Sequence, residues 1–253
     1  MTESLPILTF HALDDRASVI SSPPRVFQYG MKLLSTQGFR TISLLEAVEC
    51  LKRKVPFPER SFVLTFDDGY RSVFTEAFPI LERYAMTATV FPTIGTRRRG
   101  ASASRLPDFE GRIMLSWNEI QEMQRAGLTI GAHTVTHRDL TRLSPDEVTA
   151  EVHDGKAVLE DALGAPVDCF AYPFGRYDGT SLNIVSKHFA CACTDTLGFL
   201  GQRSSIFAME RLDAYYLRTE RLFNLMVTRW FPGYILVRGM ARMLRRKAFH
   251  HWE

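Results

Sequence analysis

The chain has 253 residues, of which 45% are hydrophobic and 23% are charged, and its formal net charge at pH 7 is +3. This composition is ordinary for a soluble globular protein, and so small a net charge argues against a nucleic acid as partner. The length is enough for one large domain and is close to that of a single (β/α) barrel.

The beginning of the chain and the cysteines indicate a compartment. Met1–Pro6 holds no basic stretch followed by an apolar run, so we expect no secretory signal, and no stretch reaches the ~18 apolar residues of a bilayer span. We therefore expect a cytoplasmic protein with reduced cysteines. Cys191 and Cys193 lie two apart on an expected strand and are interpreted as core residues, with a thiolate metal site as the alternative.

Short apolar runs alternate with helical patterns through most of the chain. Six of the runs predict strands that are apolar on both faces: residues 5–10, 62–66, 87–91, 128–132, 168–172 and 189–194. The helices between them carry start and stop signals. Capping boxes at 43–46 and 116–119 begin two helices, and the second should stop at Gly127. Ser144 caps a helix that should run to about Leu163 and stop at Gly164, and Asp178 caps a helix over 179–187. This alternation favours a parallel α/β sheet or barrel.

Two segments depart from this alternation. Residues 97–112 are basic and lack periodicity, so we expect a long loop on the same side as the motifs described below. The chain from about residue 218 is helical and basic, which predicts a barrel over 1–217 and a C-terminal extension over 218–253. We expect the extension to pack on the barrel with solvated charges. The alternative is a basic amphipathic helix resting on an anionic membrane surface.

Two adjacent carboxylates end one of the expected strands. Asp67 and Asp68 follow Phe66 and precede Gly69, which permits a tight turn. Because neighbouring side chains diverge at a strand end, one carboxylate can face a metal while the other faces a water beside it. The alternative is a plain polar turn after a buried strand.

Two imidazoles follow another expected strand. His133 and His137 are four residues apart and meet only if the chain turns helically, so we expect a helical turn within this loop. Active sites of parallel barrels lie at the carboxyl ends of the strands, where one carboxylate and two imidazoles would form a ligand set for a divalent metal. The alternative is one buried and one surface histidine.

A third string, from Phe170 to Gly175, lies at the end of a further strand. Alone it is an aromatic turn. Beside the other two strings we interpret Tyr172, Pro173, Phe174 and Gly175 as a groove wall, whose aromatic faces and backbone N–H groups suit a sugar ring and an acyl oxygen.

With these three strings in this order, the chain resembles the polysaccharide deacetylases of carbohydrate esterase family four over roughly residues 5–213. The resemblance implies a distorted (β/α) barrel of about seven parallel strands that removes N-acetyl, or sometimes O-acetyl, groups from carbohydrate polymers. It implies that Asp67 is the general base, that Asp68, His133 and His137 hold one divalent metal, and that a backbone N–H at Phe174–Gly175 helps to hold the oxyanion. Zinc is the metal we expect, although the ligands also suit cobalt, nickel or iron.

The chain departs from the family pattern in two places. Ala171 stands where the commonest third motif has an arginine that pairs with the base, and no late Leu-x-His supplies the general acid. The third string, the early His11 and the later Met209–Leu212 are more similar to the branch that acts on poly-N-acetylglucosamine-like exopolysaccharides. We hypothesise that His11 is a groove histidine, with a backbone-capping role as the alternative, and that Arg211 replaces the missing arginine beside Asp67.

These residues predict a metal-dependent hydrolase, and the resemblance implies that it releases acetate from a carbohydrate polymer or a lipid-linked glycan. Two alternatives stay open: a non-catalytic glycan-binding protein on the same barrel, and another barrel metal hydrolase. A base beside the metal argues against the first, and three firm ligands are few for the second. A membrane-facing extension would suit an enzyme that modifies lipid-linked glycans at the inner membrane face. His250 and His251 are not interpreted as a ligand pair.

Overall fold

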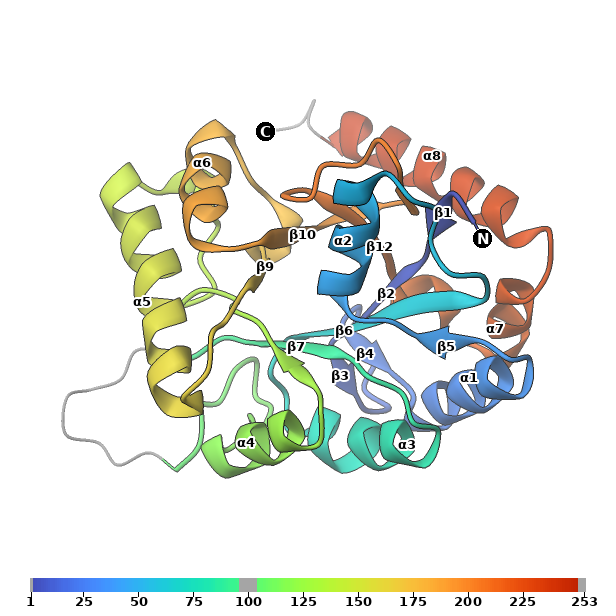
Figure 1. The fold of residues 1–253 in the computed structure, drawn as a ribbon, viewed down its shortest axis with the longest axis horizontal. Helices are drawn as coiled ribbons and strands as arrows, with labels where there is room; N and C mark the ends of the chain where they lie inside the picture. The colour runs from blue at the N-terminus through green and yellow to red at the C-terminus, as the bar shows by residue number, and fades with distance from the viewer. Residues whose placement is uncertain (1, 96–103, 250–253) are drawn as a thin grey trace.

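The computed structural model describes residues 2–95 and 104–249, with side chains described as far as residue 244. Seven parallel strands form a nearly closed barrel with helices around it (Figure 1). In spatial order these strands are β8 (Thr129–Ile130), β7 (Thr89–Pro92), β6 (Ser61–Asp68), β2 (Ile7–Phe10), β12 (Met209–Asp213), β10 (Cys191–Leu197) and β9 (Cys169–Ala171).

A single bridge brings the two outer strands of this order together. Ala132, just after β8, bridges in parallel to Phe170 of β9. The N–H of Ala132 donates to the carbonyl of Cys169 (2.9 Å), and the N–H of Ala171 donates to the carbonyl of Ala132 (3.0 Å). Gly131 permits this approach, because a Cβ there would lie 2.8 Å from the Cys169 carbonyl oxygen. The strand that leads to His133 therefore lies beside the strand that leads to the third string.

Shorter strands and the helices surround the barrel. The other strands are β1 (Ser4–Leu5), β3 (Ala12–Leu13), β4 (Ser21–Ser22), β5 (Arg40–Thr41) and β11 (Leu200–Gly201). The α-helices are α1 (Pro24–Thr36), α2 (Leu44–Arg53), α3 (Phe78–Arg83), α4 (Trp117–Arg125), α5 (Pro145–Leu163), α6 (Gly179–His188), α7 (Glu220–Met226) and α8 (Phe231–Phe249). A π-helical turn, η1 (Val73–Ala77), precedes α3, and 3₁₀ turns lie at η2 (Leu140–Arg142), η3 (Pro173–Gly175) and η4 (Ala214–Leu217).

The predicted helix signals are confirmed. Capping boxes begin α2, α4 and α5, and α5 spans Pro145–Leu163 with the left-handed Gly164 as its cap. Each of the six predicted strands is present with different ends. The sequence did not predict β12, since Glu210, Arg211 and Asp213 interrupt its apolar pattern. Tertiary pairing with β2 and β10 makes this segment a strand.

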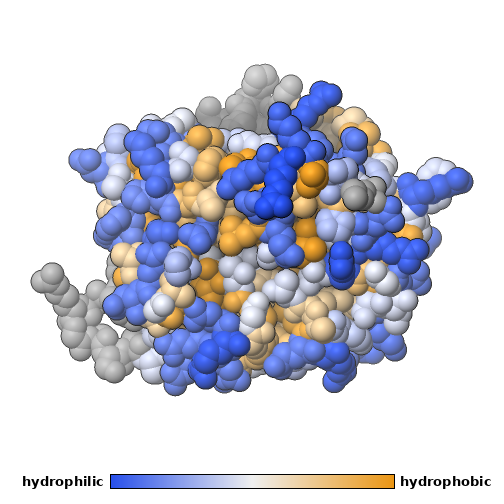
Figure 2. Space-filling view, in the orientation of Figure 1, coloured by the Kyte–Doolittle hydropathy of each residue, from blue (hydrophilic) through white to orange (hydrophobic). Residues whose placement is uncertain are grey.

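The interior is filled from several directions. The rings of Phe10, Phe27 and Phe66 lie 5.0–5.8 Å from one another and join α1 to the central strands. On the face drawn in Figure 2, hydrophilic side chains dominate the rim and hydrophobic residues gather toward the middle.

Cys191 and Cys193 are fully buried and free, which confirms that they are core residues. Burial raises the pKa of the Cys193 thiol to about 12, which disfavours a thiolate metal site.

The described part of the C-terminal extension packs against the barrel's helices. The Tyr29 hydroxyl of α1 donates to the Asn224 side chain (2.9 Å). The ring of Phe223 from α7 occupies the space over Gly30, where a Cβ would lie 2.4 Å from it. Phe231 and Ile235 lie on the barrel-facing side of α8 and are buried. The predicted boundary between 1–217 and 218–253 stays a prediction. Among the described helices, none is long and apolar enough to cross a bilayer.

Candidate active site

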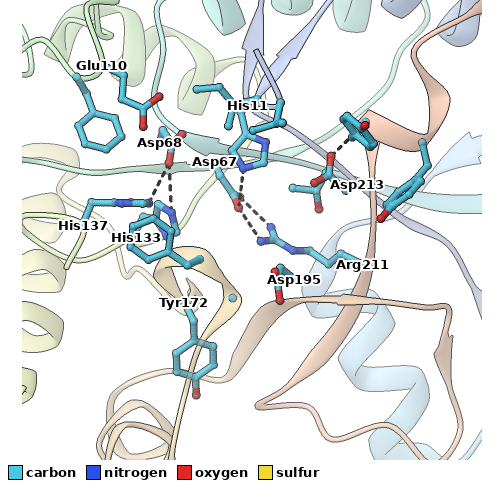
Figure 3. A pocket seen from close by; sticks show the side chains of 18 of the residues that line it. His11, Asp67, Asp68, Glu110, His133, His137, Tyr172, Asp195, Arg211 and Asp213 are labelled. Atoms are coloured by element: carbon cyan, nitrogen blue, oxygen red, sulfur yellow. Dashed lines mark hydrogen bonds and ion pairs between the residues drawn. The ribbon is translucent and has the colours of Figure 1, made fainter. Parts of the chain in front are cut away.

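The polar residues singled out in the sequence lie together at the carboxyl ends of the barrel strands (Figure 3). They line a pocket of about 350 Å³. His11 follows β2, Asp67 and Asp68 end β6, and His133 and His137 follow β8. The third string begins within β9 and runs past its end, and Arg211 lies on β12. The pocket therefore gathers side chains from across the whole chain.

Asp67 and Asp68 are the last two residues of β6, which runs two residues beyond the predicted end at Phe66. Both are nearly buried, at 3% and 4% exposure. Asp68 has a φ of 70°, a left-handed value that a non-glycine residue seldom adopts. The two carboxylates face different partners: Asp67 faces Arg211, whereas Asp68 faces the two histidines (Figure 3).

Asp68, His133 and His137 form a three-residue group with metal-ligand geometry. Oδ1 of Asp68 lies 3.4 Å from Nε2 of His133 and 3.3 Å from Nε2 of His137. One ligand atom from each residue lies within 4.8 Å of the others, and no second group of this kind occurs among the described residues. Burial would raise the pKa of Asp68, but hydrogen bonds from the two histidines hold it well below its ordinary value.

The tautomer of His133 suits the same role. Its Nδ1 lies 2.7 Å from the carbonyl oxygen of Ala171. Because a carbonyl oxygen only accepts, Nδ1 donates to it, and Nε2 is the ring nitrogen that faces Asp68 and would be the metal ligand. The donor set of one carboxylate and two neutral imidazoles therefore fits a divalent ion such as zinc.

The prediction of a helical turn between the two histidines is wrong. The loop has no helical residue, and Thr134 and His137 have left-handed φ values of 65° and 59°. The carboxylate of Glu151 on α5 holds this bend instead, since it accepts the N–H groups of Val135 (2.9 Å) and Thr136 (2.8 Å) and the hydroxyl of Thr136. Nothing in the sequence pattern distinguishes Glu151 from the other acidic residues of its helix.

Replacing Glu151 by leucine is expected to weaken metal binding. The variant removes the acceptor for both N–H groups of the bend that carries His137, and loss of a group that positions a ligand typically costs about 10–100-fold in affinity. Glu151→Gln keeps an oxygen of the same reach and should stay within a few-fold of the wild type, on the order of a threefold change at most. Competition with a chromophoric zinc chelator measures both. Equal affinities for Glu151→Leu and the wild type would contradict the positioning role.

Arg211 forms a two-pronged ion pair with Asp67. Nη1 donates to Oδ1 (2.8 Å) and Nη2 to Oδ2 (2.6 Å), and both side chains are 4% exposed. Nε of Arg211 donates to the Thr194 carbonyl (2.7 Å), which fixes the guanidinium. Burial would raise the pKa of Asp67, but the charge of Arg211 holds it below its ordinary value. Arg211 thus lies where the missing third-motif arginine would be expected to act.

His11 borders the same carboxylate from another side. Its Nε2 lies 4.0 Å from Oδ2 of Asp67, and its side chain is 21% exposed in the pocket. Asp195 and Asp213 also line the pocket, and sequence reasoning missed both. Asp195 follows the strand predicted over 189–194, a signal that could have found it, whereas Asp213 ends β12, which the sequence did not predict.

The third string is only partly the groove wall that was predicted. Tyr172 is fully buried, and its ring stacks on Tyr177 (centroids 5.2 Å apart) and points away from the pocket (Figure 3). Tyr172 borders the pocket, but its ring packs against Phe170 and Tyr177, so the prediction that this ring presents its face to a substrate is wrong. Phe174 is 53% exposed, and its ring lies 4.7 Å from that of His137. Pro173 is buried.

Gly175 is required by its surroundings. It has a φ of +62°, and an added Cβ would lie 2.1 Å from the backbone nitrogen of Asp195. Gly175→Ala is expected to lower the free energy of unfolding by about 2 kcal/mol or more. Gly164 is a matched control because it also has a φ of +62° but nothing within 4 Å of an added Cβ, so Gly164→Ala should cost only about 1 kcal/mol. Denaturant unfolding measures both. Equal losses would show that the contact with Asp195 contributes nothing.

The described part of the long loop reaches the pocket, on the side that was predicted. Phe109 and Glu110 line it, and the ring of Phe109 lies 5.1 Å from that of His137. His137 is therefore covered by two phenylalanine rings, Phe109 and Phe174. The arginines at 97–99 and the pair His250–His251 lie outside the described residues.

Comparison with known proteins agrees with this geometry. Residues 54–189 match the family model described as polysaccharide deacetylase. The chain is 27% identical over 212 residues to YxkH of Bacillus subtilis (strain 168), named as a polysaccharide deacetylase, with 82% of this chain and 70% of that protein covered. It is 26% identical over 170 residues to the poly-beta-1,6-N-acetyl-D-glucosamine N-deacetylase of Staphylococcus aureus (strain MSSA476), with 64% of this chain and 56% of that protein covered.

A solved structure shares the fold. The deacetylase PplD of Streptococcus pyogenes, solved in complex with acetate, superposes with a TM-score of 0.74 at 25% identity. The match covers 84% of this chain and 93% of PplD. The order of the three strings, the seven-stranded barrel and these relatives all point to the same family.

Proposed function

The chain belongs to the polysaccharide deacetylase family, and on that premise we propose that it is a metal-dependent hydrolase that removes N-acetyl groups from a glycan and releases acetate. O-acetyl groups are a second class of substrate for the same site. The observation that carries the proposal is a buried carboxylate, Asp67, held by Arg211 beside a three-residue metal-ligand group. A purely glycan-binding barrel has no use for a base held in this way.

Asp68, His133 and His137 are the residues that would hold the metal, and zinc is the ion that we propose. Once bound there, a divalent ion lowers the pKa of a water toward ~7 and polarises the acyl carbonyl. Nδ1 of His133 donates a hydrogen bond to the Ala171 carbonyl, so Nε2 is the nitrogen that would bind the metal. The rings of Phe109 and Phe174 pack on His137 and partly shield this ligand from solvent.

Asp67 accepts the proton of the attacking water. Its carboxylate ends the same strand as Asp68, and the charge of Arg211 keeps its pKa low, so it is ionised at neutral pH. The two hydrogen bonds from Arg211 also fix the orientation of the carboxylate. Arg211 is thus a positioning residue for the base.

The backbone N–H of Phe174 is the donor that we propose for the developing oxyanion. Pro173 has no N–H, and the N–H of Gly175 already donates to the carbonyl of Tyr172 (2.8 Å). Phe174 has a φ of 57°, an uncommon value that the packing of Gly175 against Asp195 supports. A donor fixed in this way stabilises the oxyanion without rearrangement.

His11 is the residue that we propose as donor of a proton to the departing nitrogen. It lines the pocket beside Asp67 and keeps some exposure, so it can reach both the leaving group and solvent. His11→Gln should then lower turnover of an amide substrate while metal binding is unchanged. Full turnover by this variant would remove His11 from the mechanism.

The substrate that we propose is a carbohydrate polymer or a lipid-linked glycan that contains N-acetylglucosamine. The support is the name of the S. aureus relative, a poly-beta-1,6-N-acetyl-D-glucosamine N-deacetylase, of which the matched region covers 56%. A cytoplasmic site of action and the absence of a nucleic-acid partner stay predictions from the sequence.

Acetate release from a panel of N-acetylglucosamine oligomers tests the proposal. The purified chain is stripped of metal and then given zinc, with cobalt, nickel and iron in parallel arms. Release that depends on added metal is expected, with zinc the most effective. Stoichiometric metal binding without release from any oligomer would favour a glycan-binding protein, and lipid-linked acetylated glycans would be the next substrates.

A further inference from the structure

The outward-facing side of α8 is apolar. At 100° per residue its exposed apolar residues fall within a sector roughly 120° wide. These residues are 46–69% exposed: Leu236, Val237, Met240, Met243 and Leu244. A surface helix normally turns such a sector toward the core. In α8 the sector is exposed, with one edge along a groove beside the barrel, so it is available to an apolar partner.

The orientation of α8 is set by its contacts with the barrel. Phe231 and Ile235 are both 3% exposed and pack inward. Arg242 donates to the carbonyl of Asp195 (2.7 Å) and forms an ion pair with its carboxylate. Arg238 lies over the ring of Tyr216, 5.3 Å from its centroid. Rotation that would bury the apolar sector would break these contacts, so the exposed sector is a property of the folded chain.

The apolar surface borders the catalytic pocket. A groove of about 770 Å³ lies between α8 and the β10–β11 segment, and Leu236, Met240 and Met243 line it together with Phe199. Arg242 lines both this groove and the pocket that holds Asp67 and Asp68. A surface that covers the sector would therefore lie at the edge of the pocket.

The charge of the extension indicates what kind of surface that is. Residues 218–253 hold eight Lys and Arg against two Asp and Glu, a formal charge of +6, whereas residues 1–217 hold 23 against 26, a charge of −3. Trp230, at the start of α8, is 64% exposed, with the guanidinium of Arg229 over its ring (4.7 Å). Basic charge, an exposed tryptophan and a sector of leucine, valine and methionine are together typical of helices that lie in the headgroup layer of a bilayer.

We propose that α8 rests on an anionic lipid bilayer through this apolar sector and places the catalytic pocket beside the membrane, so that the substrates are acetylated glycans held at that surface. The second half of the statement rests on the function proposed for the pocket. The first half depends only on α8 and on the charge of the extension. Attraction of the basic extension to anionic headgroups adds to the burial of the sector and weakens with salt.

Co-sedimentation with vesicles tests the proposal on the full chain. Vesicles of phosphatidylcholine alone are compared with vesicles that also contain phosphatidylglycerol, at low and at high salt. Binding to the anionic vesicles is expected, with weaker binding at high salt and on the neutral vesicles. The double variant Leu236→Glu/Met243→Glu should lower the apparent affinity by about tenfold or more.

A matched control separates the position of the change from its chemistry. Val55 and Ile113 are 43% and 56% exposed and lie outside α8 and outside the pocket. The double variant Val55→Glu/Ile113→Glu adds the same charge and should bind vesicles like the wild type. A melting curve for each variant shows that the fold is kept.

Several results would overturn the proposal. They are no binding by the wild type, equal binding to neutral and anionic vesicles, or equal loss in the two double variants. A dimer of the free chain that Leu236→Glu/Met243→Glu dissociates, without vesicle binding, would assign the sector to a second copy of the chain. Acetate release from soluble oligomers is measured on the same preparations. Vesicle binding without release would contradict the function proposed for the pocket while supporting the membrane surface.

Discussion

Replacing Asp67 by asparagine is expected to lower acetate release by a factor on the order of 10² or more. An amide of the same size keeps one oxygen that accepts from Arg211. Its NH2 group cannot accept the second hydrogen bond, and the side chain cannot take a proton from water. The metal-ligand group does not include Asp67, so the variant should bind one metal per chain with nearly the affinity of the wild type. Steady-state turnover and a metal titration on the same preparation measure the two effects.

The neighbouring aspartate provides the control. Asp68→Ala removes the oxygen that lies 3.4 Å and 3.3 Å from the two histidines, so this variant should lose both the metal and the activity. If Asp67→Asn lost the metal while Asp68→Ala retained it, Asp67 would be the metal ligand and Asp68 the base. Wild-type turnover in Asp67→Asn would exclude it as the base.

Replacing Arg211 by methionine is expected to destabilise the protein by about 3–5 kcal/mol, because it leaves the carboxylate of Asp67 buried without its partner. Both side chains are only 4% exposed, so solvent compensates poorly for the lost guanidinium. Denaturant unfolding at neutral pH measures the loss. The double variant Asp67→Leu/Arg211→Met removes both charges and should recover most of that stability, although it has no base.

The pH dependence of Arg211→Met distinguishes a positioning role from a merely structural one. In the wild type the charge of Arg211 outweighs burial and holds the pKa of Asp67 below its ordinary value. Without Arg211, burial dominates and the pKa rises, so Asp67 becomes protonated at a higher pH. The acidic limb of kcat/KM should therefore move to higher pH in the variant. An unchanged limb, with lower stability, would make Arg211 only a structural residue.

The sign of the stability effect follows from the same shift. A carboxyl group whose pKa is lower in the folded than in the unfolded state stabilises the fold above its unfolded pKa, and the contribution is lost as the pH falls through the folded pKa. The stability difference between wild type and Arg211→Met should accordingly be largest at neutral pH. It should shrink on acidification, as Asp67 becomes protonated in the wild type as well.

Local signals in the sequence determined much of the architecture. The capping boxes at Ser43, Ser116 and Ser144 predicted where three helices begin. In each box the serine and the glutamate three residues later accept hydrogen bonds from N–H groups at the start of the helix, and these bonds need no contact with other elements. Gly164 ended α5 for an equally local reason, its left-handed φ. Apolar runs predicted six strands, because a strand covered on both sides must be apolar on both faces.

The residues proposed as metal ligands and as the base were also singled out in the sequence. Asp67 and Asp68 at one strand end, and His133 and His137 after another, indicated a shared site because parallel barrels bring these ends together. The prediction that Arg211 lies beside Asp67 came from a gap in the family pattern at Ala171. The two-pronged pair with Asp67, and the strand that carries Arg211, became visible only in the folded chain.

Only the tertiary structure decided how these residues are held. The bend that brings His137 to Asp68 depends on left-handed residues and on Glu151 from a distant helix, whereas the i, i+4 spacing suggested a helical turn. The ring of Tyr172 is buried because it packs against Phe170 and Tyr177, contacts that its residue type does not reveal. Local sequence determines elements that satisfy their own hydrogen bonds. Side-chain direction and long-range positioning depend on which elements become neighbours, and that is settled only when the barrel forms.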